Sequence, residues 1–139
     1  MYRALLYLSL ILISACSSTS GRSQTIEFRH FIRDFFGGED FQAAHTQFPL
    51  EVVSWTGDSE VTSTSVTRID WEFYKGPAYF QCEKNCYDIV IYDDFAKSQS
   101  DSGERVLAFE GISNGINSSM YFRLTNGKWY LVKIEDFNN

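Results

Sequence analysis

Two cysteines in the middle of the chain are the sharpest candidates for chemistry. Cys82 and Cys86 flank the short segment Glu83-Lys84-Asn85. A three-residue hairpin loop with Asn85 in the left-handed conformation would place the two cysteines opposite each other, within reach of a disulfide. Two free thiols are the alternative. A metal site is disfavoured because two cysteines supply half of a tetrahedral ligand set, and redox dithiols usually have Cys-x-x-Cys spacing. The spacing therefore favours a structural disulfide.

Two histidines are the next candidates. His30 and Asp34 are four residues apart, so a helix would bring them together as an acid–base pair. They would lie opposite the phenylalanine face of that helix, however, which favours a solvated polar surface. His45 can line the mouth of a pocket, and ordinary partial burial is the alternative.

Carboxylates beside aromatic residues are the third kind of candidate. Asp70 precedes Trp71, and Asp88 follows the second cysteine of the pair. A carboxylate in apolar surroundings has a raised pKa and is a place to look for function. We therefore predict a possible pocket formed by His45, Asp70 and Trp71, with no catalytic residue, no metal site and no cofactor.

The amino terminus has the pattern of an export signal. Arg3 is followed by an apolar run over residues 4–13, which is shorter than the roughly 20 residues that span a bilayer. The run ends in Ile13-Ser14-Ala15-Cys16, which resembles the lipobox of bacterial lipoproteins. The resemblance implies a signal peptide over residues 1–15, a lipid on Cys16 and attachment to the membrane through that lipid. An ordinary secretory signal is the alternative.

Composition limits what the rest of the chain can do. Residues 16–25 are small and polar and predict a flexible tether, and residues 26–139 are long enough for one domain. The net charge of −6 argues against binding nucleic acid. The tether lacks the acidic run that directs some lipoproteins to the cell surface. We therefore expect an outer-membrane lipoprotein of the cell envelope that faces the periplasm.

The elements that must position these residues begin with helices. Residues 26–36 predict an amphipathic helix with Glu27 in its first turn and Gly37-Gly38 at its end. Its apolar face consists of Phe28, Phe31, Ile32, Phe35 and Phe36. A second helix is expected over residues 41–47, with Asp40 as its N-cap and Phe48-Pro49 after it.

The remainder predicts strands. Residues 50–55, 61–71, 79–82 and 86–92 have strand composition, and residues 93–104 are polar and predict an exposed loop. Asn114-Gly115 and Asn126-Gly127 are typical of two-residue hairpins. The pairs predicted from them are Leu124 with Trp129, Phe122 with Leu131, Leu107 with Phe122, and Phe109 with Met120. These pairs place Leu107, Phe109, Met120, Phe122, Leu124, Trp129 and Leu131 on one buried face. The opposite, more polar face carries Ala108, Glu110, Tyr121, Arg123 and Tyr130.

The predicted fold class is α+β, with two or three N-terminal helices packed on a curved, mostly antiparallel sheet. Three segments also carry a family resemblance: Phe28-x-x-Phe31-x-x-x-Phe35, Asp40-Phe41-Gln42 and Phe48-Pro49-Leu50. Together with the ending Asn126-Gly127-Lys128-Trp129-x-Leu131, they resemble the Bacteroidetes lipoproteins of domain of unknown function 4348. The resemblance covers most of residues 26–137 and implies a cone-shaped fold like that of nuclear transport factor 2.

Such a fold holds a pocket between helices and sheet, but it hosts enzymes and binding proteins alike. The expected function is a non-enzymatic binding module whose partner is a small apolar ligand or an envelope protein. A small pocket enzyme of the hydratase or isomerase kind, or a purely structural role in assembly, is the alternative.

Overall fold

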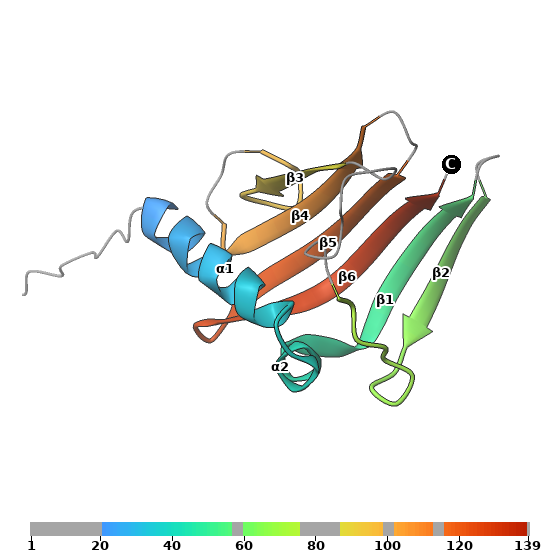
Figure 1. Ribbon diagram of the computed structural model, residues 1–139, viewed down its shortest axis with the longest axis horizontal. Helices are drawn as coiled ribbons and strands as arrows, with labels where there is room; N and C mark the ends of the chain where they lie inside the picture. The colour runs from blue at the N-terminus through green and yellow to red at the C-terminus, as the bar shows by residue number, and fades with distance from the viewer. Residues whose placement is uncertain (1–20, 57–59, 76–86, 99–101, 113–115, 139) are drawn as a thin grey trace, which may run out of the picture.

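Two helices pack on a curved sheet of six strands in the computed structural model, which describes residues 21–56, 60–75, 87–98, 102–112 and 116–138. Helix α1 lies across one face of the sheet, and α2 connects it to the first strand (Figure 1). The elements are α1 (Gly21–Phe35), α2 (Glu39–Ala44), β1 (Thr46–Thr56), β2 (Glu60–Val66), β3 (Tyr87–Tyr92), β4 (Glu104–Gly111), β5 (Ile116–Thr125) and β6 (Lys128–Asn138). No described helix has the length and apolar character needed to cross a membrane.

Helix α1 forms because its phenylalanines recur on one face. Phe28 and Phe35 are fully buried, whereas Arg29, His30 and Arg33 face solvent. The helix begins at Gly21, five residues before the predicted start, so part of the predicted tether is helical. Glu27 consequently lies in the second turn, and the first turn contains no acid. Extending a helix that is already anchored by packed side chains costs little per residue, which explains the earlier start.

Helix α2 is shorter than predicted and is capped differently. It begins at Glu39 with the extended residue Gly38 as its N-cap, so Asp40 lies inside the first turn and the predicted Asp40 cap is wrong. Both acids of that turn lie near the positive end of the helix dipole. The helix ends at Ala44 because Thr46 already pairs with Leu131 of the sheet.

The strand order is β2-β1-β6-β5-β4-β3, and every neighbouring pair is antiparallel except β1 and β6. Strand β1 starts at Thr46, before the predicted residue 50, and contains Phe48-Pro49. Strand β2 ends at Val66, five residues before the predicted end. Beyond it the Thr67 hydroxyl donates a hydrogen bond to Asp70, and a local side-chain bond of this kind favours a turn over a strand.

The two predicted hairpins have different outcomes. Leu124 pairs with Trp129 and Phe122 pairs with Leu131, as Asn126-Gly127 predicts, and both turn residues have positive φ (52° and 75°). The register between β4 and β5 is displaced by two residues from the prediction. Leu107 pairs with Met120 instead of Phe122, and Phe109 pairs with Ser118. The connection therefore has four residues, 112–115, instead of two.

The face of the sheet that α1 covers, here called the helix face, is the hydrophobic core. Its centre is Phe122, whose ring meets those of Phe28, Phe31 and Phe35 at centroid distances of 5.4, 5.7 and 5.3 Å with steep interplanar angles. Edge-to-face contacts of this kind add to the free energy gained from burying the rings. The core cluster comprises Phe28, Phe35, Leu50, Leu107, Phe109, Met120, Phe122, Trp129 and Leu131.

The opposite face, here called the outer face, is more buried than the sequence predicts. Val106, Ala108 and Tyr121 are buried on it, although the pattern predicts one buried face and a more polar opposite face. The segment after β3 covers part of this face, since the ring of Phe95 packs edge-on against Tyr121 at 5.3 Å. Residues 93–95 are therefore at least partly buried, whereas residues 96–98 are exposed, as predicted for the loop over residues 93–104.

Several predicted features lie outside the described residues. These are the signal peptide over residues 1–15, the lipid site Cys16, the strand over residues 79–82, the pair Cys82 and Cys86, and the turn at Asn114-Gly115. They stay predictions.

Candidate functional site

The connection between the helices and the segment after β2 is held by one buried glutamine. The Gln42 side-chain amide donates to the backbone oxygens of Phe35 (3.2 Å) and Tyr74 (2.8 Å). Its oxygen accepts from the backbone N–H of Tyr74 at 2.7 Å. The Thr46 hydroxyl in turn donates to the Gln42 backbone oxygen at 2.8 Å. These bonds fix α2 against both the end of α1 and the segment 71–75, and they place the residue that follows α2.

That residue is His45, which lies in a stack of aromatic rings. Its imidazole is stacked on Phe41 at 4.0 Å and faces Tyr130 at 5.8 Å, and the ring of Phe31 meets it edge-on at 5.6 Å. Nδ1 lies 2.9 Å from the backbone oxygen of Phe41. A carbonyl oxygen can only accept, so Nδ1 carries the proton and Nε2 of the neutral ring is an acceptor. The His45 backbone oxygen also accepts from Leu131, which ties the stack to β6.

A groove runs along this stack, between α1, α2 and the turn that joins β5 to β6. We call it the His45 groove, and its volume is about 360 Å³. This volume falls within the range of small-molecule sites. Charged side chains line the groove on the side of α1 and on the side of the hairpin. The floor between them consists of apolar and aromatic side chains. Its lining residues are Glu27, Phe31, Asp34, Phe41, His45, Leu124, Gly127, Lys128 and Trp129.

A second groove of about 300 Å³ lies near the same hairpin turn. Tyr130, which faces His45, lines it together with Arg68, whose guanidinium lies 4.8 Å from the centre of the Phe48 ring. Its remaining lining residues are Ala44, Thr46, Gln47, Thr125 and Asn126. The two grooves therefore differ in charge, because Arg68 is the charged residue lining the second.

The other residues that the sequence singled out have separate surroundings. Asp70 is exposed and accepts its hydrogen bond from Thr67. Trp71 is half-buried and packs edge-on against Phe48 at 5.8 Å. His30 is exposed, in line with the solvated polar face predicted, and Asp88 is exposed on β3. Of the predicted pocket residues, His45 is the one that lines the groove described above.

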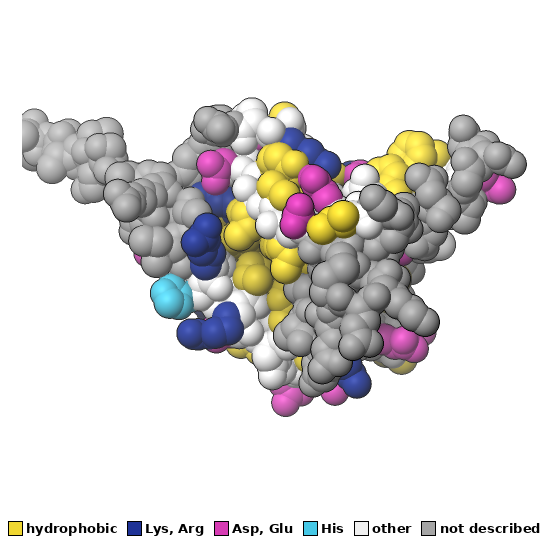
Figure 2. Space-filling view, turned by 45° about the horizontal axis from the view of Figure 1, so that its top comes forward, with side chains coloured by type: hydrophobic (Ala, Val, Ile, Leu, Met, Phe, Trp, Pro, Cys, Tyr) yellow, Lys and Arg dark blue, Asp and Glu magenta, His cyan; other side chains and the backbone are white. Residues whose placement is uncertain are grey.

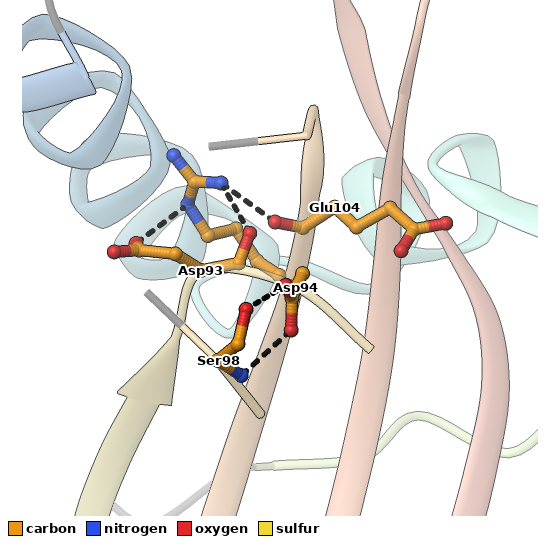
Figure 3. A network of polar contacts seen from close by, with 5 residues as sticks. Asp93, Asp94, Ser98 and Glu104 are labelled. Atoms are coloured by element: carbon orange, nitrogen blue, oxygen red, sulfur yellow. Dashed lines mark hydrogen bonds and ion pairs between the residues drawn. The ribbon is translucent and has the colours of Figure 1, made fainter. Parts of the chain in front are cut away.

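Arg105 is a buried charge that the sequence reasoning missed. The side chain is fully buried on the helix face, and its guanidinium lies 5.3 Å from the centre of the Trp129 ring. Nη1 donates to the backbone oxygens of Asp93 (3.0 Å) and Glu104 (2.6 Å), and Nε lies 3.6 Å from the Asp93 carboxylate (Figure 3). The signal was present, since residues 105, 107 and 109 share one face of β4. Arg105 fixes the segment after β3 to the start of β4.

The turn that follows Asp93, over residues 94–98, is held by hydrogen bonds of its own. Both the backbone N–H and the hydroxyl of Ser98 donate to the Asp94 carboxylate, as Figure 3 shows. These bonds lower the pKa of Asp94 below its ordinary value. The charged form of Asp94 therefore stabilises the turn that carries Phe95 over the outer face.

A second polar cluster lies on the outer face. The Tyr121 hydroxyl donates to Glu135 at 2.5 Å, and the Lys133 ammonium lies at 2.5 Å from the other oxygen of that carboxylate. Burial and the bond to Glu135 raise the pKa of Tyr121. Burial tends to raise the pKa of Glu135 as well, but its bonds with Lys133 and Tyr121 outweigh this and lower it. These contacts stabilise the charged form of Glu135 and the neutral form of Tyr121.

Apolar side chains are also exposed at the opposite end of the sheet. Trp55 of β1 pairs with Val61 of β2 and with Phe137 of β6, and the rings of Trp55 and Phe137 stack at 5.2 Å. Val61 is 48% exposed. On the side shown in Figure 2, hydrophobic side chains also gather in a central band with Lys and Arg side chains along one flank.

Across the described part of the chain, no group of three or more His, Cys, Asp or Glu could hold a metal ion.

The family assignment follows from comparison with known proteins. The model of a domain of unknown function, DUF4348, matches residues 11–136 of the chain. The chain belongs to the DUF4348 family. The predicted resemblance to domain of unknown function 4348 is thereby confirmed. No curated protein matches the DUF4348 chain.

Solved structures show the fold of the DUF4348 domain. An NTF2-like protein from Bacteroides fragilis is similar at 21% identity with a TM-score of 0.54 over 78% of this chain, which spans 46% of that one. An NTF2-like protein of unknown function from Silicibacter pomeroyi is 10% identical, with a TM-score of 0.51 over 85% of this chain and 98% of its own. One from Shewanella baltica is 10% identical, with a TM-score of 0.50 over 86% and 96%. The predicted fold, like that of nuclear transport factor 2, is confirmed.

Proposed function

We propose that this DUF4348 domain is a lipid-anchored, non-enzymatic binding module of the bacterial cell envelope, with the His45 groove as its binding site. The observation that carries the proposal is the groove itself. It combines an aromatic floor with charged side chains from Glu27, Asp34 and Lys128 in a volume of about 360 Å³. Binding sites are concave and combine apolar surface with a few placed polar groups, and the groove has this combination.

The walls of the groove are fixed before any ligand arrives. The Gln42 bonds hold α2, the His45 backbone bond to Leu131 joins it to β6, and the Asn126-Gly127 turn sets the opposite wall. A preorganised site loses less conformational entropy when it binds.

A screen of small fragments by two-dimensional NMR tests the groove. We expect the fragments that bind to shift the backbone amide signals of Leu124, Gly127 and Lys128, and a His45→Ala variant to abolish those shifts. An exposed residue outside the groove provides the matched control, Glu72→Ala, which should leave them unchanged. Fragment binding that is confined to other parts of the domain would contradict the assignment of the site.

The lipid anchor is proposed from Ile13-Ser14-Ala15-Cys16. In the bacterial host, wild-type protein should incorporate a clickable palmitate analogue and fractionate with the outer membrane, and Cys16→Ser should do neither. Ser17→Ala is the matched control and should behave as wild type. Protection of the domain from protease in intact cells would support the periplasmic orientation. Labelling that persists in the Cys16→Ser variant would refute the anchor.

A further inference from the structure

We infer that the group recognised in the His45 groove is a protonated amine, carried by a ligand of the alkylammonium class. This inference rests on the proposed function, because it names the chemistry of the ligand for the same site. It follows from three properties of the groove: the aromatic rings that line it, the excess of carboxylates among its charged residues and the acceptor nitrogen of His45.

The aromatic residues supply the first part of the argument. Phe31 and Phe41 line the groove with ring centroids 6.0 Å apart, and each also contacts the His45 ring. The face of an aromatic ring attracts a cation, and this attraction grows when water is partly excluded. The methylene groups of an alkylammonium ion fit the same apolar floor, so one ligand can satisfy both requirements.

The carboxylates supply the second part. Glu27 and Asp34 are seven residues apart on α1, which places them on one face of the helix, two turns apart, and both line the groove. Lys128 is the cationic residue among the lining side chains, so two carboxylates face one ammonium. Asp34 also contacts Arg33 at 3.1 Å, but both side chains are more than half exposed, and ion pairs of this kind contribute little. A cationic ligand can therefore compete with Arg33 for Asp34.

His45 supplies the third part. Its Nδ1 proton is committed to the backbone oxygen of Phe41, so Nε2 of the neutral ring accepts a hydrogen bond. An ammonium group has three N–H donors and no acceptor. Two carboxylates and one imidazole among the lining residues of the groove match that donor set, whereas a carboxylate ligand would meet acceptors. In the second groove Arg68 would instead repel an ammonium group.

The decisive experiment compares three probes of similar size and different charge on the full chain purified in mild detergent. The probes are n-butylammonium, 1-butanol and butyrate, each titrated while the amide signals of Leu124, Gly127 and Lys128 are followed by NMR. We expect saturable shifts with n-butylammonium at millimolar concentration. 1-Butanol should bind about fivefold more weakly, since one modest electrostatic contribution of about 1 kcal/mol corresponds to that factor. Butyrate should bind more weakly still.

Two variants distinguish recognition of the ammonium group from binding in the groove in general. Glu27→Gln with Asp34→Asn should weaken the binding of n-butylammonium, while the affinity for 1-butanol stays unchanged. The control Asp88→Asn removes one exposed carboxylate outside the groove and should alter neither affinity. Equal affinities for the three probes in the wild-type protein would overturn the amine assignment and leave the groove as a binding site. Failure of every probe and every screened fragment to shift the groove signals would overturn both proposals.

Discussion

Replacing Gln42 should destabilise the domain more than any other single change to an uncharged polar side chain described above. The residue is fully buried, and its side chain makes three hydrogen bonds to the backbone of Phe35 and Tyr74. Each such bond contributes about 1 kcal/mol net, and a buried partner left without one costs a similar amount or more. Gln42→Ala should therefore lower the free energy of unfolding by about 3 kcal/mol.

Urea denaturation followed by tryptophan fluorescence measures this loss. With an m-value of about 1.5 kcal/mol per M, the midpoint should fall by about 2 M. Gln47→Ala, an exposed glutamine five residues along the chain, is the matched control and should change the free energy by less than about 0.5 kcal/mol.

A second substitution distinguishes hydrogen bonding from packing. Gln42→Glu has nearly the same volume and keeps the acceptor for Tyr74 N–H, but it replaces the donor with an oxygen that faces the carbonyls of Phe35 and Tyr74. A buried carboxylate against two carbonyl oxygens is unfavourable, so Gln42→Glu should cost at least as much as Gln42→Ala at neutral pH. A Gln42→Glu variant as stable as wild type would refute the reasoning, because the loss in Gln42→Ala would then come from the cavity alone.

Four further predictions follow, three from other contacts in the structure and one from the sequence. The lowered pKa of Glu135 means that its charged form stabilises the fold above the pKa of the unfolded chain, and that this contribution is lost as the pH falls. Melting temperatures should therefore drop less between about pH 5 and about pH 3 in Glu135→Gln than in wild type, and equal drops would contradict the role of the cluster. Gly127→Val forces a β-branched residue into positive φ and should cost about 2 kcal/mol by urea denaturation, with Lys128→Val as the neutral control. Arg105→Met leaves two backbone oxygens without their donor and should cost about 3 kcal/mol, whereas a neutral result would show that those bonds contribute nothing net. The Cys82–Cys86 disulfide should appear in the intact mass as a deficit of two hydrogens that reduction restores, and a mass at the fully reduced value would exclude it.

Local signals predicted the architecture because they agree with the tertiary structure. The phenylalanine spacing of α1 is both a helical pattern and the set of side chains that fills the core. The register across Asn126-Gly127 was predictable because a two-residue turn with positive φ leaves one way to pair the strands. The register between β4 and β5 was displaced because its loop has four residues instead of two. Side chains alternate with a period of two, so a displacement of two residues preserved the buried face.

The features that were not predictable depend on contacts between distant segments. Gln42 is polar, and local sequence patterns give no reason to bury it, because its partner Tyr74 lies 32 residues further along the chain. The cover that Phe95 provides for Tyr121 likewise depends on how a loop folds back over the sheet. His45 was recognisable as a candidate by residue type, yet the groove around it exists only once α1, α2 and the last hairpin have come together.

The parallel pairing of β1 with β6 has a consequence for how the chain folds during synthesis. Val52 of β1 pairs with Ile134 of β6, so β1 has no neighbouring strand on that side until β6 has been made. Strand β6 also lies between β1 and β5, and a ribosome-bound chain that lacks it has two separate sheet fragments, β2-β1 and β5-β4-β3, instead of one sheet. Contacts of such large sequence separation form slowly and late. The export proposed above would gain time from this order of assembly, because the sheet cannot close before β6 has been made.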